Sequence, residues 1–216
     1  MGDDLARTRA EDYDDKHQHI LDSAADLFAQ KGFVNASIND IAAACRMSKS
    51  ALYHYHKSKE AILFAILSTH VRTVLADARA ALDGIAEPEL RLCRFVASLM
   101  GNYASARSKH IVLLNETGSL AAAEEREVRD LGRKLVALAI DVLTPLNPEL
   151  MAKRQLRKPY AMFFYGMVNW TYTWYDATGA LKPDELSRRI ADLFLDGFVR
   201  MSATERPRPP GEIAKS

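Results

Sequence analysis

Residues 37–60, SINDIAAACRMSKSALYHYHKSKE, contain two short helix signals separated by a tight turn and followed by a third. Ser37 can cap the first helix, and the apolar residues after it recur at helical spacing. Ser48 can cap the second helix, whose Leu52 then points inward. The pattern predicts two short helices packed against each other on either side of a turn near Arg46.

The charge of this stretch has one sign. No acidic residue occurs between positions 41 and 59, whereas four basic residues do, Arg46, Lys49, Lys57 and Lys59. A short helix with exposed Lys, Ser, Tyr and His side chains and a basic rim suits the phosphates of a DNA duplex. We expect DNA contacts from Ser37, Ser48, Lys49, Ser50, Tyr53, His54 and Lys59.

Each of these residues has an expected role. Lys49 offers a charge to a phosphate or to a guanine edge, and Ser50 is small enough to let the helix lie deep in the groove. Tyr53 and His54 can reach the DNA backbone or a thymine methyl group. Ser37 and Lys59 would hold phosphates at the two flanks.

Three segments resemble, in order and spacing, the DNA-binding domain of the TetR family of bacterial transcriptional regulators. They are ILDSAADLFAQKGF at 20–33, DIAAAC at 40–45 and SKSALYHYHKSKEAI at 48–62. Arg46 stands where the family usually has Gly, and His56 where Phe or Tyr is common. The resemblance assigns backbone contacts to Tyr53 and His54.

The resemblance implies an all-α fold, with an N-terminal three-helix helix-turn-helix DNA-binding domain and a six-helix ligand-binding and dimerisation domain. It implies a ligand-responsive repressor that binds double-stranded operator DNA of palindromic sequence as a homodimer. We expect residues 1–14 to form a disordered acidic N-terminus and 15–57 the helix-turn-helix domain. Residues 58–202 would form the ligand-binding and dimerisation domain, and 203–216 a disordered tail.

Composition agrees with a globular chain of one or two domains. The 216 residues are 48% hydrophobic and 26% charged, with a net charge of +1. Basic character is therefore local to the stretch quoted above. Helical periodicity covers nearly the whole chain. Beyond the first three helices, we expect helices near 58–82, 90–105, 108–117, 121–143, 152–177 and 183–201.

Aromatic and Met side chains in the C-terminal region suit an apolar pocket, although they suit a plain helical core as well. The ligand-binding candidates are Leu99, Met100, Tyr103, Arg107, Leu113, Asn115, Glu116, Phe163, Met167, Asn169, Trp170 and Trp174. Arg107, Lys109 and His110 could together hold an anionic group such as a coenzyme A phosphate, or form a solvated corner. The stretch 169–198 resembles TetR members that respond to acyl-CoA thioesters, which implies a small hydrophobic or acyl-CoA effector.

The last two long helices predict an interface. The final one has a broad apolar stripe, formed by Leu186, Ile190, Leu193, Phe194, Phe198 and Met201. The preceding helix is apolar nearly all round between residues 160 and 174. Both helices could simply fill the core of one protomer. We expect instead that they meet their symmetry mates in a four-helix homodimer interface.

Other classes of protein find little support. No GxSxG, P-loop or GxGxxG motif occurs, so we expect neither an enzyme nor a cofactor. His17-x-His19 and His54-x-His56 lack further ligands at chelating spacing, so we expect no metal site. Cys45 and Cys93 fit buried thiols in a reducing cytoplasm. The alternatives are a ligand-independent, nucleoid-type DNA binder and a repressor of an efflux system that senses hydrophobic drugs.

We also expect a cytoplasmic protein that makes no membrane contact. The N-terminus has no apolar segment typical of a signal peptide. The longest uncharged run, residues 159–175, has 17 residues and includes Asn169, so it is short for a membrane span.

Overall fold

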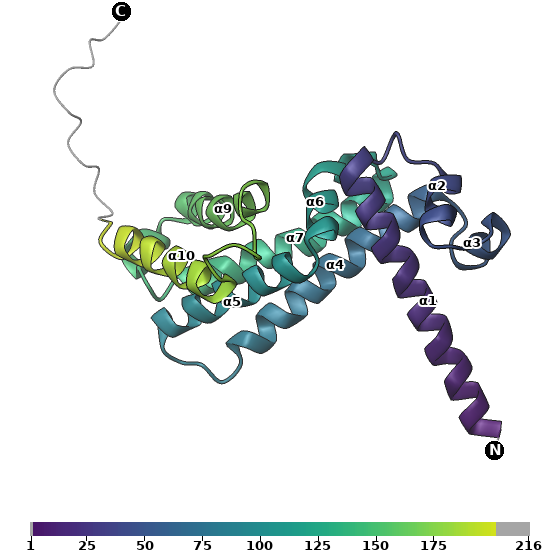
Figure 1. The fold of residues 1–216 in the computed structure, drawn as a ribbon. Coiled ribbons are helices and arrows are strands. Elements are labelled where there is room, and N and C mark those ends of the chain that lie inside the picture. Colours follow the sequence, from purple (N-terminus) through teal and green to yellow (C-terminus); the bar gives the residue numbers. More distant parts are fainter. Residues whose placement is uncertain (1, 202–216) are drawn as a thin grey trace, which may run out of the picture.

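The computed structural model describes residues 2–201, with side chains from Tyr13 onward. Within these residues the chain is all-helical, which confirms the predicted fold class (Figure 1). The α-helices are α1 (Gly2–Lys31), α2 (Ile38–Ala44), α3 (Lys49–Tyr55), α4 (Lys59–Leu82), α5 (Pro88–Ser105), α6 (Arg107–Glu116), α7 (Ala122–Leu143), α8 (Pro148–Ala152), α9 (Arg154–Trp170) and α10 (Pro183–Phe198). Two 3₁₀ turns, η1 (Thr117–Ser119) and η2 (Thr171–Thr173), follow α6 and α9.

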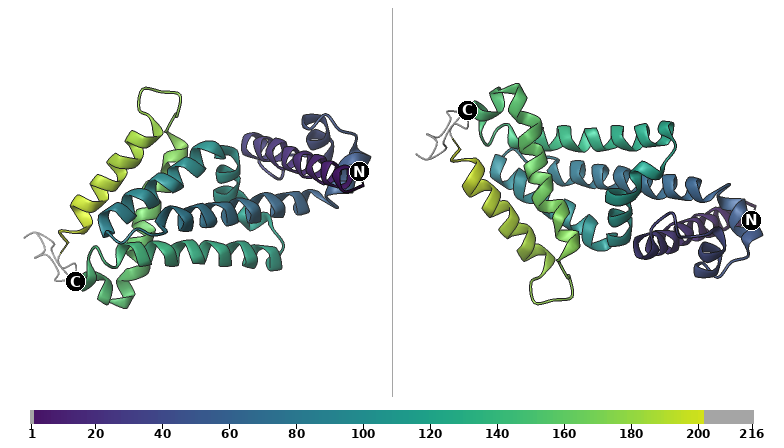
Figure 2. Two further views of the ribbon diagram at one scale, coloured as in Figure 1. Left: turned by 90° about the horizontal axis from the view of Figure 1, so that it is seen from below. Right: turned by 90° about the horizontal axis from the view of Figure 1, so that it is seen from above.

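The helices form an N-terminal head, α1–α3, and a larger C-terminal body, α4–α10. The head lies at one end of an elongated molecule, and α9 and α10 lie toward the other end (Figures 1 and 2). Helix α4 begins beside the head and runs on into the body (Figure 2). Helix α6 contacts α1 as well as α4 and α5, so it lies where the head and the body meet.

Serine caps begin three of the first four helices, and the sequence predicts those at Ser37 and Ser48. The Ser37 hydroxyl accepts a hydrogen bond from Asp40 N at 3.1 Å, and the Asp40 carboxylate accepts one from Ser37 N, which completes a capping box. Ser48 and Ser58 accept hydrogen bonds from the backbone three residues on, each at 3.1 Å. These caps satisfy backbone donors that the first helical turn leaves free.

Helix α4 packs against both the head and the body, whose buried side chains form one continuous hydrophobic core. Its first turns bury Ile62 and Leu63 completely, and its later turns bury Val71 and Ala78. By length and composition alone α4 could cross a membrane, but 56% of its most apolar window is buried inside the protein. Apolar side chains covered by other helices are those of a core helix in a globular protein.

The first helix differs from the prediction. Helix α1 begins at Gly2, not near residue 15, so residues 2–14 are helical where we expected disorder. Residues 3–14 contain neither Gly nor Pro and include several good helix formers, which lets the helix extend. The predicted disordered tail, 203–216, lies outside the described residues.

The region after α7 also differs from the prediction. The expected helix at 152–177 ends earlier, at Trp170, and a short extra helix, α8, precedes it. Asn147 caps α8 by accepting a hydrogen bond from Leu150 N at 3.1 Å, and its amide donates to Phe198 O at 2.9 Å. At the other end, the β-branched Thr171 turns its hydroxyl back onto Val168 O at 2.7 Å, where the helix tightens into η2.

A buried histidine pair makes stability depend on pH. His70 Nε2 lies 3.5 Å from His110 Nδ1, and both side chains are almost fully buried. Burial lowers the pKa of His70 to about 4 and that of His110 to about 3, from an ordinary value of 6.5. The unfolded chain therefore binds more protons than the folded chain below pH 6.5.

We expect the melting temperature to be steady above pH 6.5 and to fall steadily between pH 6.5 and pH 4. Circular dichroism melts at pH 7.5, 6 and 5 measure this fall. Replacing both rings (His70→Phe with His110→Phe) should make the decline less steep, because no charge can then form at that site, and buried His56, whose pKa is also lowered to about 4, still contributes. The exposed His54→Phe should leave it unchanged. An equally steep decline in the double variant would contradict the assignment.

Candidate DNA interface and ligand cavity

Helix α3 presents a polar, basic face to solvent. Leu52 is fully buried against the head, and the side chains on the other side of the helix are exposed. Lys49 lies over the Tyr53 ring, with Nζ 5.9 Å from the ring centroid. The structure thus brings together five of the seven residues predicted to bind DNA, Ser48, Lys49, Ser50, Tyr53 and His54.

Ser37 is exposed at the N-terminus of α2, but its hydroxyl is already engaged. It donates to the Asp40 carboxylate at 2.7 Å. The hydrogen bonds from Ser37 lower the pKa of Asp40, and nearby Lys31 lowers it further. An ionised carboxylate therefore stands beside this position, which weakens Ser37 as a candidate for phosphate binding.

Lys59 has a different role from the predicted one. Its ammonium donates to Phe33 O and Ala36 O, both at 2.8 Å, and lies 3.5 Å from Val34 O. It also lies 4.3 Å from the centroid of the Phe33 ring. Because a Lys ammonium has three donors, these carbonyls leave none for a phosphate. Lys59 holds the loop between α1 and α2 against the start of α4.

The structure shows the conformation of the two residues that depart from the usual family pattern, Arg46 and His56. Arg46 adopts φ 54°, the left-handed region in which Gly is favoured, so the turn keeps its shape with an Arg side chain exposed beside α3. Its positive charge makes Arg46 a DNA-binding candidate that the predicted set omits. His56 is buried, stacks on His17 with ring centroids 4.9 Å apart, and has a pKa lowered by burial to about 4.

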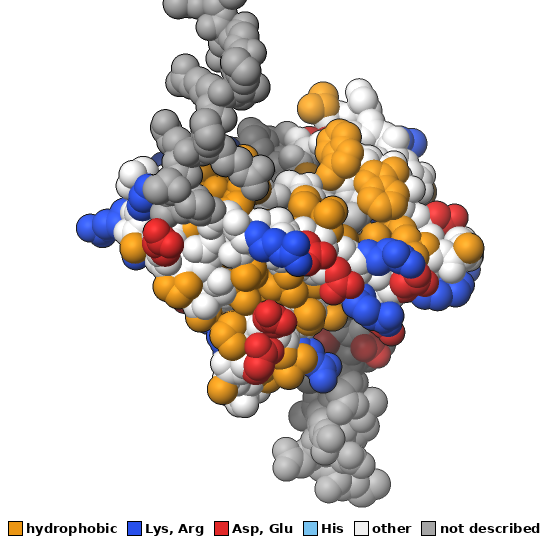
Figure 3. Space-filling view, turned by 90° about the vertical axis from the view of Figure 1, so that its left-hand side faces the viewer, with side chains coloured by type: hydrophobic (Ala, Val, Ile, Leu, Met, Phe, Trp, Pro, Cys, Tyr) orange, Lys and Arg blue, Asp and Glu red, His pale blue; other side chains and the backbone are white. Residues whose placement is uncertain are grey.

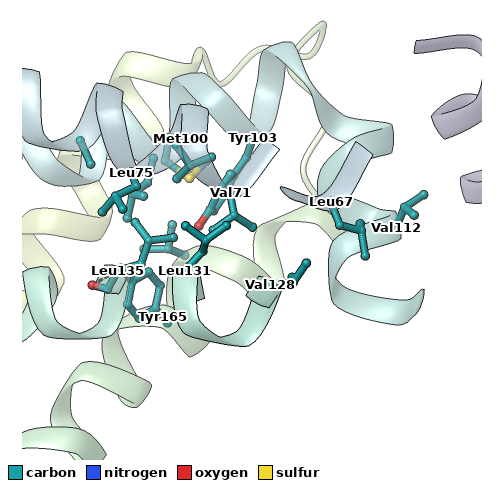
Figure 4. Close-up of a cluster of buried hydrophobic side chains, with 14 of the residues drawn as sticks. Leu67, Val71, Leu75, Met100, Tyr103, Val112, Val128, Leu131, Leu135 and Tyr165 are labelled. Atoms are coloured by element: carbon teal, nitrogen blue, oxygen red, sulfur yellow. Dashed lines mark hydrogen bonds between the residues drawn. The ribbon is translucent and has the colours of Figure 1, made fainter. Parts of the chain in front are cut away.

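The body contains a cavity of about 400 Å³ between α4, α5, α6, α7 and α9. In Figure 4, Val71 from α4, Tyr103 from α5 and Leu131 from α7 point toward one another in this region. Buried side chains such as Val71 and His110 form the deep part of the cavity, and exposed ones such as Asn115 and Met162 form its mouth. Four predicted ligand residues line it, Tyr103, Leu113, Asn115 and Asn169.

Sequence reasoning missed most of the cavity wall. Helix α7 supplies Val128, Gly132, Leu135 and Val136. His110 from α6 and Tyr165 from α9 also line it. The helical spacing of the α7 residues was a usable signal, because they share one face of the helix.

Several other predicted ligand residues lie elsewhere. Leu99 and Met100 are buried in the core on α5, outside the cavity lining. Arg107 is exposed and donates to Tyr172 O at 2.9 Å. Glu116 accepts a hydrogen bond from Phe33 N at 3.0 Å, so it joins α6 to the head.

The predicted anion-binding cluster at 107–110 forms only in part. Arg107 and Lys109 line one open hollow, but Asp22 and Asp26 line it too and His110 does not. Lys109 pairs with Asp22 of α1 at 2.5 Å, and His110 is buried beside the cavity. Arg107 instead binds a backbone carbonyl of the η2 turn. The three side chains thus make contacts in three different places.

A second hollow, an open groove of about 730 Å³, lies on the outside of α9 and α10. The remaining predicted ligand residues line this groove, Phe163, Met167, Trp170 and Trp174. Leu193 beside them is 69% exposed, and Trp170 is 63% exposed. Figure 3 shows large hydrophobic side chains gathered on this end of the molecule, with charged side chains around them.

The side chains that the structure describes form neither a candidate metal site nor a reactive cysteine site. No three of the described His, Cys, Asp and Glu residues are grouped so that they could hold a metal ion. Cys45 is buried and Cys93 is half-buried, both with free thiols. Burial raises the pKa of both thiols, which makes them less reactive than an exposed cysteine.

Comparisons with known proteins agree on one family. Residues 20–66 match the family described as "Bacterial regulatory proteins, tetR family", and residues 86–198 match "Tetracyclin repressor-like, C-terminal domain". A solved TetR-family transcriptional regulator from Bordetella parapertussis is 41% identical, with a TM-score of 0.81. The match covers 86% of this chain and 97% of that one.

Two further relatives are informative. A structure of AibR in complex with isovaleryl coenzyme A and operator DNA is 28% identical, with a TM-score of 0.68, over 83% of this chain and 96% of that one. The HTH-type transcriptional regulator UidR of Escherichia coli K12 is 38% identical over 66 residues, 31% of this chain and 34% of UidR. The chain spans about half the length, or less, of the curated relatives that it matches.

The contacts of Lys59 predict an effect on stability. Lys59→Met keeps most of the side-chain length but removes the hydrogen bonds to the loop carbonyls, and should lower the free energy of unfolding by about 1.5–3 kcal/mol. Lys57→Met is the matched control, because Lys57 is exposed. Urea unfolding followed by circular dichroism measures both variants. Equal stability of Lys59→Met and Lys57→Met would show that the loop does not depend on this ammonium.

Proposed function

The chain belongs to the TetR family of bacterial transcriptional regulators, and we propose that it acts as a dimeric, ligand-released repressor of a palindromic operator. The observation that supports this most directly is the exposed face of α3. Lys49, Tyr53 and His54 lie on it without any acidic neighbour on the helix, and Leu52 fixes the helix from behind. A helix presented in this way can enter a major groove.

The groove on α9 and α10 supports dimerisation. Trp170 and Leu193 are largely exposed in a single chain, and a contiguous apolar surface of this kind marks an interaction site. A second copy of the same face would cover these side chains in an isologous four-helix interface. Two heads related by a two-fold axis could then contact successive major grooves of a palindromic operator.

The cavity in the body supports an effector. A largely apolar cavity of about 400 Å³ has the size of a site for a small molecule. AibR, solved with isovaleryl coenzyme A and operator DNA, suggests the acyl-CoA thioesters as the first class to test. The cavity would hold the acyl group, and the nucleotide part would lie outside its mouth. Ligand and DNA would favour different conformers, so each would weaken the binding of the other.

A labelled duplex from the region upstream of the gene tests this function directly. We expect sequence-selective binding in fluorescence anisotropy, and we expect one chain length in an acyl-CoA series to release the duplex. Lys49→Ala should weaken binding and reduce the slope of log affinity against log salt by about one. Lys134→Ala, an exposed lysine on the body, is the control.

Each outcome separates one alternative. Equal affinity for unrelated duplexes would favour a nucleoid-type DNA binder over a repressor. Selective binding that no acyl-CoA disturbs would keep the repressor and exclude the thioester, which leaves hydrophobic drugs as the next class. An unchanged salt slope in Lys49→Ala would remove this residue from the interface.

The dimer is tested separately. Leu193→Glu places a charge in the centre of the apolar groove, and we expect the species near twice 24.1 kDa to be replaced by the monomer in sedimentation velocity. The matched control is Val34→Glu, because Val34 is 80% exposed and lies in the head. A Leu193→Glu protein that remains dimeric would place the interface elsewhere. Operator affinity should fall together with dimerisation.

A further inference from the structure

Two residues that line the cavity each have a buried polar atom with no protein partner. The atoms are Nε2 of His110, on α6, and Oδ1 of Asn169, on α9. A buried donor or acceptor without a partner costs about 1–3 kcal/mol, so such atoms are uncommon in folded proteins. Two residues of this kind in the wall of one cavity point to a ligand group that completes their hydrogen bonding.

The His110 ring is held in place with one nitrogen left over. His70 Nε2 faces Nδ1 of His110 at 3.5 Å, and the Tyr103 ring stacks on the imidazole with centroids 3.6 Å apart. The ring is 2% exposed, and burial lowers its pKa to about 3, so it is uncharged at neutral pH. A fixed, neutral imidazole can donate or accept one hydrogen bond at Nε2, depending on its tautomer.

The rest of the cavity wall is mostly apolar and contains one charged side chain, Arg129. Besides His110 and Asn169, apolar side chains such as Leu113, Val128 and Leu135 line the cavity. Among the residues that line it, Arg129 has the only formal charge, and its guanidinium binds Glu125 on the exposed side of α7. A carboxylate placed deep in the cavity would lose its hydration, and the neutral His110 ring, the Asn169 oxygen and the Tyr103 hydroxyl offer no positive charge in return, which is costly.

We infer that the cavity takes an apolar ligand whose buried polar group is uncharged and can both donate and accept, a hydroxyl or an amide, bound between His110 Nε2 and Asn169 Oδ1. A hydroxyl that donates its one proton to the Asn169 oxygen can accept from His110 when Nε2 is protonated. A primary amide has two N–H donors and a carbonyl, so it can also serve the other tautomer. This inference rests on the proposed function, in which the cavity is the effector site. It narrows the effector to neutral molecules, or to ligands whose charged part stays outside the mouth.

Three eight-carbon probes test the inference with the full-length protein. We expect 1-octanol and octanamide to bind at least tenfold more tightly than octanoate at pH 7.5 in isothermal titration calorimetry. The three probes share one chain length, so the difference reports the polar group. Octanoate binding as tightly as octanol would overturn the inference, and so would the absence of binding by all three.

Two variants test whether His110 and Asn169 cause the preference for octanol over octanoate. Asn169→Leu and His110→Phe keep the shape of each side chain roughly and remove its polar atom, so the preference for octanol should fall below threefold. Asn115→Leu is the matched control, because Asn115 is exposed at the mouth and its amide already donates to Ile111 O at 2.9 Å. If His110→Phe does not fold, Asn169→Leu decides alone. A preference that survives in Asn169→Leu would overturn the inference.

Operator binding separates this inference from the proposed function. If octanol binds with the expected preference but does not change operator affinity, the inference about the cavity is supported and the proposed release of the operator by a ligand is contradicted. If octanol and octanoate bind equally and both release the operator, the proposed release by a ligand is supported and the preference for a neutral ligand is contradicted. The same anisotropy assay reports both results.

Discussion

The structure depends on one helix, α4, that packs against both the head and the body. Helix α4 has 24 residues, about 36 Å at 1.5 Å per residue, and it reaches from the head into the body. Its first residue, Lys59, binds the carbonyls of the loop before α2, and Val71, about halfway along the helix, lines the cavity. Because the same rigid element contacts both places, the position of α3 relative to the body follows the position of α4.

Helix α6 makes a second connection between the cavity and the head. Its buried His110 lines the cavity, whereas Lys109, the preceding residue, pairs with Asp22 of α1. At the end of the same helix, Glu116 accepts a hydrogen bond from Phe33 N. A ligand that displaces the cavity wall must therefore move α6 against α1 or break these contacts. Coupling between two sites needs a contiguous element of this kind, with different contacts in each state.

The fold and the face of α3 could be predicted from the sequence because both follow from local rules. Helical spacing shows which side of a helix is buried, and Ser37, Ser48 and Ser58 mark where helices begin. The order of the segments then identified the family. The same rules predicted that Lys59 binds a DNA phosphate. A lysine beside a basic surface gives the same sequence pattern whether its ammonium binds a phosphate or a backbone carbonyl. Only the approach of residues 33–36, which are far from it in the sequence, decides between these roles.

The ligand residues could not be predicted from the sequence. Helical periodicity shows that one face of a helix is buried, but it does not show what that face packs against. Glu116 and Phe33 are 83 positions apart, so no local pattern shows their hydrogen bond. Trp170 and Tyr165 lie five residues apart on one apolar helix, yet Tyr165 lines the inner cavity and Trp170 the outer groove. A helix that is apolar on most sides has more hydrophobic surface than one chain covers. The excess on α9 and α10 is therefore best explained by a second copy of the chain, which also gives a two-fold operator two reading heads.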